Sequence, residues 1–123
     1  MLFDTIICGT NKHKKVNIRG VKLVLRALWS KLKSIFFLFP ITSQESHDLQ
    51  YSLKVPEIEC QRAGLQKQSW VRVDEFNVVS CESLFDFEDL KPQGRFSRAF
   101  VRKIALKIKE VKAIKLLKKV SRD

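Results

Sequence analysis

The chain is poor in the residues that mark linkers, disulfide scaffolds and membrane spans. Its 123 residues include only four glycines and three prolines, which excludes a low-complexity chain. The three cysteines are odd in number and show no CxxC or CxxH spacing, which argues against a disulfide framework and a thiolate metal site. The longest apolar run, Ile35 to Ile41, is far shorter than the ~20 residues of a membrane-spanning helix. We therefore expect a reducing compartment, no membrane partner, and no metal or other cofactor.

The N-terminus also lacks the charge order of a secretory leader. A signal peptide places basic residues before its apolar stretch, whereas here Asp4 is the first charge and the basic cluster comes later. We therefore predict a cytoplasmic location. A hydrophobic content of 45%, with nine phenylalanines, suffices for one modest core, so the sequence predicts a single domain over residues 1–123.

Positive charge is abundant, and it is unevenly distributed along a chain whose formal net charge is +11. Residues 1–40 carry eight basic residues and one acid, residues 41–97 carry six and ten, and residues 98–123 carry ten and two. This basic–acidic–basic layout predicts a polyanion-binding surface built from the two ends of the chain. For the C-terminal run alone, a solvated lysine-rich helix is the simpler explanation.

Apolar periodicity predicts several short strands followed by one long helix. Ile35 to Phe39 is expected to be a central strand buried on both faces, because no polar residue interrupts it, and Pro40 is expected to end its pairing. Other strands are expected at Leu2 to Cys8, Tyr51 to Val55, Trp70 to Asp74 and Phe76 to Val79. Ser97 is a suitable N-cap for a helix from Arg98 to about Lys119. The inward face of this helix is expected to comprise Phe100, Val101, Ile104, Ala105, Ile108 and Val111.

Residues 20–33 fit two alternative structures. An apolar stripe at helical spacing from Val21 to Leu32 favours an amphipathic helix, whereas Val21 to Leu25 also suits a strand. We prefer the strand for Val21 to Leu25, because the central strand needs a neighbour on each edge. Tyr51 to Val55 is expected to supply the other edge.

Three motifs in series resemble the MazF/PemK family of toxins from type II toxin–antitoxin systems. They are Pro40-Ile41-Thr42-Ser43-Gln44, then Gly64-Leu65, then Ser69-Trp70-Val71-Arg72-Val73-Asp74-Glu75-Phe76. The resemblance extends from about Ile35 to about Ala105 and is weaker before that, as in a divergent, N-terminally shortened member. It implies an α+β fold, a small, mainly antiparallel SH3-like β-barrel with a long C-terminal α-helix. It also implies a strand after Gly20 followed by a short helix around Ala27 to Leu32.

The same resemblance implies a metal-independent endoribonuclease that cleaves single-stranded RNA. Such toxins act as homodimers and are neutralised by an acidic antitoxin protein. In metal-free cleavage the 2′-hydroxyl attacks the adjacent phosphate, and a guanidinium beside a hydroxyl suits the charge that develops there. Thr42 matches the threonine of the family, and Arg19 is the best counterpart of its arginine, with Gly20 in place of the usual proline. Arg26 is the alternative arginine.

Five residues are candidates for contacts with nucleic acid. Lys12, Lys14 and Lys15 lie in a polar loop before Arg19, where ammonium groups suit the phosphates of a single strand, and Ser43 and Gln44 complete the motif. A Thr-Ser pair also commonly caps a turn, so Thr42 has a purely structural alternative.

Several other interpretations remain open. The chain could be a catalytically decayed relative that only binds nucleic acid or antitoxin, or a basic amphipathic protein that lies on membrane surfaces through residues 20–39 and 98–120. His13 and His47 suggest an acid–base pair, although loop histidines are mostly solvated. Trp70 could stack on a base, but a strand tryptophan more often belongs to the core. Arg72 and Asp74, two positions apart, are expected to form a surface pair.

Overall fold

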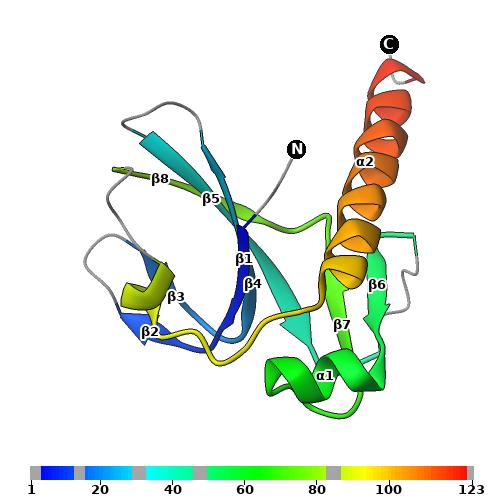
Figure 1. Ribbon diagram of the computed structural model, residues 1–123. Coiled ribbons are helices and arrows are strands. Elements are labelled where there is room, and N and C mark those ends of the chain that lie inside the picture. Colours follow the sequence, from blue (N-terminus) through cyan, green and yellow to red (C-terminus); the bar gives the residue numbers. More distant parts are fainter. Residues whose placement is uncertain (1–3, 13–15, 29–32, 46–49, 83–86, 122–123) are drawn as a thin grey trace.

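The described part of the chain forms an α+β fold in which all strand pairs are antiparallel (Figure 1). The computed structural model describes residues 4–12, 16–28, 33–45, 50–82 and 87–121. The strands are β1 (Asp4–Cys8), β2 (Asn11–Lys12), β3 (Asn17–Ile18), β4 (Lys22–Leu28), β5 (Lys33–Thr42), β6 (Ser52–Val55), β7 (Ser69–Arg72) and β8 (Asn77–Glu82). The helices are α1 (Glu57–Ala63), the 3-10 helix η1 (Phe87–Leu90) and α2 (Arg98–Ser121). The α+β class, the mainly antiparallel sheet and the long C-terminal helix expected from the sequence are confirmed.

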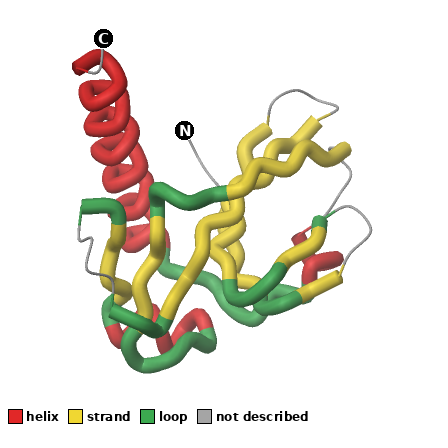
Figure 2. The backbone as a smooth tube through the Cα atoms, turned by 180° about the vertical axis from the view of Figure 1, so that it is seen from behind, coloured by secondary structure: helices red, strands yellow, loops and turns green. Residues whose placement is uncertain are grey.

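The long strand β5 belongs to two parts of the sheet. It pairs with β4 along one edge, while on its other edge Lys33 to Leu38 pair with β8 and the last two residues pair with β7. The strand order is β1-β4-β5-β7-β6, with β8 beside β5. Among the described residues β1 and β6 do not pair with each other, so the sheet is open and is not closed into a barrel. Seen from behind, α2 stands at one side of the strands (Figure 2).

Both faces of β5 are covered, as the uninterrupted apolar run predicted. Phe36 and Leu38 pack into one buried cluster, and Phe37 and Phe39 pack against the other. The first cluster consists of Ile6, Cys8, Val16, Ile18, Val24, Phe36, Leu38, Cys81 and Leu90. The second consists of Ile7, Leu23, Leu25, Phe39, Val55, Cys60, Ala63, Val71, Val73, Phe96, Phe100, Ile104 and Val111, which brings α1 and α2 against the sheet.

Pro40 does not end the pairing of the central strand, contrary to the expectation from its missing N–H group. β5 continues to Thr42, and the N–H of Ile41 donates to the carbonyl of Val21 at 3.0 Å. Because successive residues of a strand direct their N–H groups to opposite edges, the nitrogen of Pro40 faces the other edge. There β8 has ended opposite Leu38 and β7 begins opposite Ile41, so no ladder bond is required from Pro40.

The ambiguous segment after Gly20 is a strand. β4 runs from Lys22 to Leu28 and pairs with β1 and β5, which excludes the continuous amphipathic helix. The short helix expected around Ala27 to Leu32 is wrong at its first two residues, which belong to β4, and the remainder, 29–32, lies outside the described residues. Strand pairing with two partners outweighs the helical periodicity of these residues.

The predicted pairing of Tyr51 to Val55 with the central strand was also wrong. The segment Tyr51 to Val55 forms β6, as expected for a strand, but β6 pairs with β7 rather than with β5. The second neighbour of β5 is β8, whose residues Asn77 to Glu82 extend the expected Phe76 to Val79 strand. The sequence pattern identifies strands without specifying which of them pair.

α2 begins at the predicted N-cap, which is tied to α1. The N–H of Phe100 donates to Ser97 Oγ at 3.3 Å. The buried carboxylate of Glu59, in α1, accepts hydrogen bonds from the backbone N–H of Ser97 at 2.8 Å and from the Ser97 hydroxyl. A carboxylate at this position also lies at the positive end of the α2 dipole. The start of α2 is therefore held by a second helix.

The inward face of α2 is largely the predicted one. Phe100, Ile104 and Val111 are buried, with Val101 and Ile108 packed beside them. Ala105 is half-buried. After Val111 the helix continues for a further ten residues, and Figure 1 shows these turns standing away from the sheet. The last turns therefore leave the core.

Candidate functional site

Arg19 and Thr42 lie at the same end of the β4–β5 pair. The hydrogen bond from the N–H of Ile41 to the carbonyl of Val21 shows that the two segments are still adjacent at these residues, one before Thr42 and two after Arg19. Arg19 and Gly20 are exposed, and Gly20 has φ 74°, a left-handed conformation that glycine adopts without a steric penalty. The N–H of Gly20 donates to Thr10 Oγ1 at 2.9 Å, which holds the entry to β4. The strand at Val21 to Leu25 thus brings the two predicted residues to one end of the sheet.

Thr42 caps the turn after β5, as expected from the alternative in which its role is purely structural. Its Oγ1 accepts a hydrogen bond from the N–H of Gln44 at 3.1 Å, which shapes the chain after β5. This contact uses the oxygen as an acceptor, and the hydroxyl proton remains available for donation. Ser43 and Gln44 are exposed beyond it. The capping role and a role in positioning a phosphate are therefore compatible at Thr42.

Part of the predicted basic loop is described. Lys12 is exposed in β2, which pairs with β3 as a short hairpin just before Arg19. Lys14 and Lys15 lie outside the described residues, as do both histidines of the suggested acid–base pair. The described geometry therefore places one of the three lysines on the stretch of chain that leads to Arg19.

The alternative arginine, Arg26, has a different environment. Its guanidinium forms an ion pair with Asp4 of β1 at 2.6 Å. Arg26 pairs with Phe36 across the β4–β5 ladder, which is six residues from Thr42 along β5. The structure therefore separates Arg26 from the Thr42 end of the sheet.

Trp70 belongs to the core, in agreement with the preferred interpretation. Only 5% of its surface is exposed, and the Nζ of Lys54 lies 5.8 Å from the centre of its ring. It pairs with Thr42 across the β5–β7 ladder, so it supports the backbone of the candidate site from within. A buried ring offers little area for stacking a base.

A groove that the sequence analysis did not predict opens between α2 and the sheet. It has a volume of about 560 Å³. Its walls are Leu25, Phe37 and Phe39 from the sheet, Val73 and Phe76 from the β7–β8 turn, and Ala105, Ile108 and Val111 from α2. Lys109, Lys112 and Lys115 complete the α2 wall. In the sequence these lysines alternate with the apolar stripe of the helix, and this pattern is the one that could have indicated this wall of the groove.

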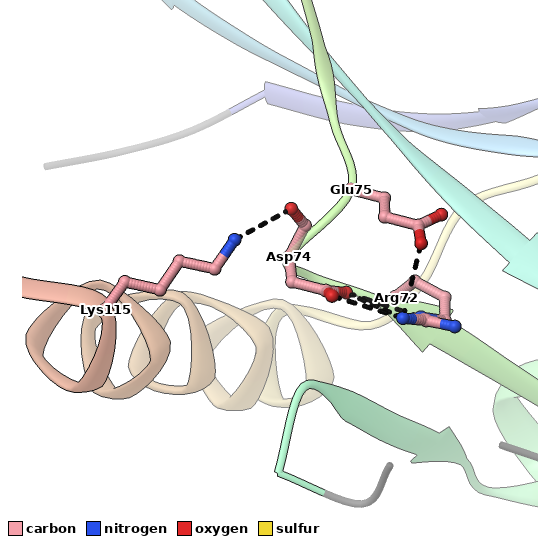
Figure 3. Close-up of polar contacts among 4 residues, drawn as sticks. All are labelled: Arg72, Asp74, Glu75 and Lys115. Atoms are coloured by element: carbon pink, nitrogen blue, oxygen red, sulfur yellow. Dashed lines mark hydrogen bonds and ion pairs between the residues drawn. The ribbon is translucent and has the colours of Figure 1, made fainter. Parts of the chain in front are cut away.

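One polar network holds the β7–β8 turn against α2 (Figure 3). The Arg72 guanidinium contacts the carboxylates of Asp74 at 3.1 Å and of Glu75 at 3.4 Å, which confirms the predicted Arg72–Asp74 pair. From α2, the Nζ of Lys115 donates to the backbone carbonyl of Asp74 at 3.2 Å. The same Nζ lies 5.8 Å from the centre of the Tyr51 ring. These contacts set the separation between α2 and the turn that carries Phe76.

The described cysteines and carboxylates do not form a metal-binding cluster. Cys8, Cys60 and Cys81 are free and buried, and burial raises the pKa of Cys8 to about 11, with a rise at Cys60 for the same reason. Among the described residues, no three side chains of the metal-binding types gather in one place. In the described ranges, no helix combines the length and apolar character that crossing a membrane requires.

No family model, no curated protein and no solved structure matches this chain.

Proposed function

We propose that this chain is a toxin-type endoribonuclease that cleaves single-stranded RNA without a metal, at the end of the sheet that carries Arg19 and Thr42. The β4–β5 register is the observation that carries this proposal, because it brings the two motif residues to one end of the sheet. The open sheet would then be a variant of the SH3-like barrel, with the long strand β5 shared by its two halves.

The chemistry assigns a separate task to each residue. The 2′-oxygen forms a bond to phosphorus while the bond from phosphorus to the 5′-oxygen breaks, which leaves a 2′,3′-cyclic phosphate and a 5′-hydroxyl. The proton lost by the 2′-hydroxyl is balanced by the proton gained at the 5′-oxygen. Arg19 stabilises the charge on the non-bridging oxygens through its planar fork of donors, and the Thr42 hydroxyl positions the phosphate by a hydrogen bond.

Charge supplies the affinity for RNA and for the proposed inhibitor. The net charge of +11 attracts the polyanionic substrate, and Lys12, Lys14 and Lys15 precede Arg19 where they suit phosphates further along the strand. Ser43 and Gln44, exposed next to Thr42, would add polar contacts. An acidic antitoxin would compete for the same positive surface in the cytoplasm, and a homodimer would present two such ends.

The test compares RNA cleavage by the purified chain and three variants, with EDTA present. Arg19→Lys retains the charge but loses the fork, and Thr42→Val retains the shape but loses the hydroxyl. Loss of one preorganised donor to a developing oxyanion typically reduces the rate by about 10²–10³-fold, and we expect this reduction for Arg19→Lys and for Thr42→Val. Arg26→Lys is the matched control, because Arg26 is held by Asp4 away from Thr42, and its rate should stay within about twofold of the parent.

Three outcomes separate the alternatives. Cleavage that yields 2′,3′-cyclic phosphate ends, survives EDTA and depends on Arg19 and Thr42 supports the proposal. Cleavage that disappears in EDTA would exclude the metal-free mechanism. RNA binding without cleavage, measured by fluorescence anisotropy, would identify the chain as a relative that binds nucleic acid but has lost its activity.

A further inference from the structure

We propose that the groove between α2 and the sheet binds an acidic, amphipathic helix of a partner protein. This groove is defined by the walls described above, and neither Arg19 nor Thr42 is among its described lining residues. The proposal does not depend on RNA cleavage, so a chain without ribonuclease activity could still bind such a helix.

The apolar walls of the groove are partly uncovered. Phe76 contacts the rings of Phe37 and Phe39, with centroid distances of 5.9 and 5.3 Å, yet 46% of its surface is exposed. Val78 does not line the groove, but it lies opposite Phe37 in the β5–β8 pair and is 54% exposed. Large apolar side chains gathered at an open groove indicate a binding surface for apolar anchors.

The backbone of the groove indicates that its occupant is helical. One wall is α2, whose backbone groups are bonded within the helix, and the other is formed by β4 and β5, which are paired on both edges beside the groove. α2, β4 and β5 therefore offer no free sheet edge to an extended chain, and the remaining wall, Val73 and Phe76, lies in a turn and not in a strand. A bound segment must therefore satisfy its own backbone, as an α-helix does, and insert side chains at positions i, i+3, i+4 and i+7.

The charge of the groove indicates an acidic occupant and argues against a second copy of this chain. Three lysines of α2 line it, and no acid is among its described lining residues. Over its whole length α2 carries nine basic residues and a single acid, Glu110. Two copies packed groove to groove would bring these like charges together, whereas glutamates flanking an apolar stripe would complement them.

The groove is formed before any partner binds. Lys115 bonds to the carbonyl of Asp74, and Asp74 is held by Arg72, so these contacts link the turn that carries Phe76 to α2. A preformed groove spares the cost of ordering its walls when a helix enters.

The probe is a fluorescein-labelled helical peptide of about 18 residues, or about 27 Å, with leucines at the four anchor spacings and glutamates elsewhere. Its binding to the full-length chain is followed by fluorescence anisotropy. One control peptide has lysine in place of each glutamate, and another has the same composition without the helical period. We expect binding of the probe alone, weakening as NaCl is raised from about 0.05 to about 0.5 M.

Matched protein variants locate the binding site. Phe76→Ser removes an apolar anchor and Lys112→Glu reverses a charge of the groove, and each should weaken binding by about tenfold or more. The controls Leu106→Ser and Lys103→Glu change exposed α2 residues that do not line the groove, and each should stay within about twofold. Because Lys112 is exposed, its variant tests the site even where Phe76→Ser lowers the stability.

Four results would overturn the proposal. They are absence of binding at millimolar peptide, equal binding of the control peptides, equal sensitivity to the groove and control variants, and self-association that Phe76→Ser abolishes. Analytical ultracentrifugation detects the last of these, which would assign the groove to a second copy of the chain. If a short RNA does not displace the probe from the parent, and Phe76→Ser does not change RNA affinity, the peptide and RNA surfaces are distinct, which supports the proposal.

Discussion

Replacing Glu59 by glutamine should weaken the attachment of α2 to the rest of the molecule. Glu59 is 7% exposed, and its two carboxylate oxygens accept hydrogen bonds from the N–H and the hydroxyl of Ser97, the N-cap of α2. Glutamine keeps one acceptor for the N–H, and its NH₂ group can donate to the serine oxygen. The charge at the helix N-terminus is lost, and the hydroxyl must turn to a different partner.

The magnitude follows from these contacts. Hydrogen bonds to a charged group contribute about 1.5–3 kcal/mol, neutral ones about 0.5–1.5 kcal/mol, and a charge near a helix end about 0.3–1 kcal/mol. Exchanging two charged bonds for neutral ones and losing the charge near the helix end should therefore lower the free energy of unfolding by about 2–3 kcal/mol for Glu59→Gln. Glu59→Ala leaves the N–H of Ser97 without its carboxylate partner and should cost about 3–4 kcal/mol.

Urea unfolding at pH 7, followed by circular dichroism at 222 nm, is the assay. Glu57→Gln is the matched control, because Glu57 is an exposed acid in the first turn of the same helix, and its cost should stay below about 0.5 kcal/mol. A double-mutant cycle with Ser97→Ala isolates the coupling between the two side chains. Equal effects of Glu59→Gln and Glu57→Gln, or no coupling to Ser97, would refute the reasoning.

Three further predictions concern other parts of the molecule. Gly94→Ala should destabilise the fold by about 1–3 kcal/mol in the same urea assay, because an added Cβ would lie 2.6 Å from the α1 backbone; an unchanged midpoint would contradict this close packing. The pKa of Cys8 is raised by burial from 9.0 to about 11, so the free energy of unfolding should fall as pH rises above 9, and less so in Cys8→Ala. Its thiol should react with iodoacetamide only after denaturant is added, and rapid native labelling would disprove its burial. Replacing Lys12, Lys14 and Lys15 by glutamine should flatten the slope of log RNA affinity against log salt by about two, and an unchanged slope would show that these lysines do not contact phosphate.

Arg19 and Thr42 were chosen through the family resemblance, and their roles stay a prediction. The structure brings them to one end of the β4–β5 pair, because Val21 to Leu25 is a strand beside the apolar run that Thr42 follows. The groove could not be predicted from the sequence. Its walls come from β4, β5, the β7–β8 turn and α2, which are distant in the sequence. No local pattern specifies that a groove would open between α2 and the sheet.

The amino-acid sequence by itself determined the α+β class, the two-sided burial of β5 and the start of α2 at Ser97. These features depend on alternation, apolar runs and capping residues, which act over a few positions. Only the tertiary structure decided that β8 rather than β6 lies beside β5, that Pro40 is tolerated between two ladder partners, and that Glu59 holds the helix cap. Each of these depends on which distant segments become neighbours, and that choice is made by the packing of the whole chain rather than by any one segment.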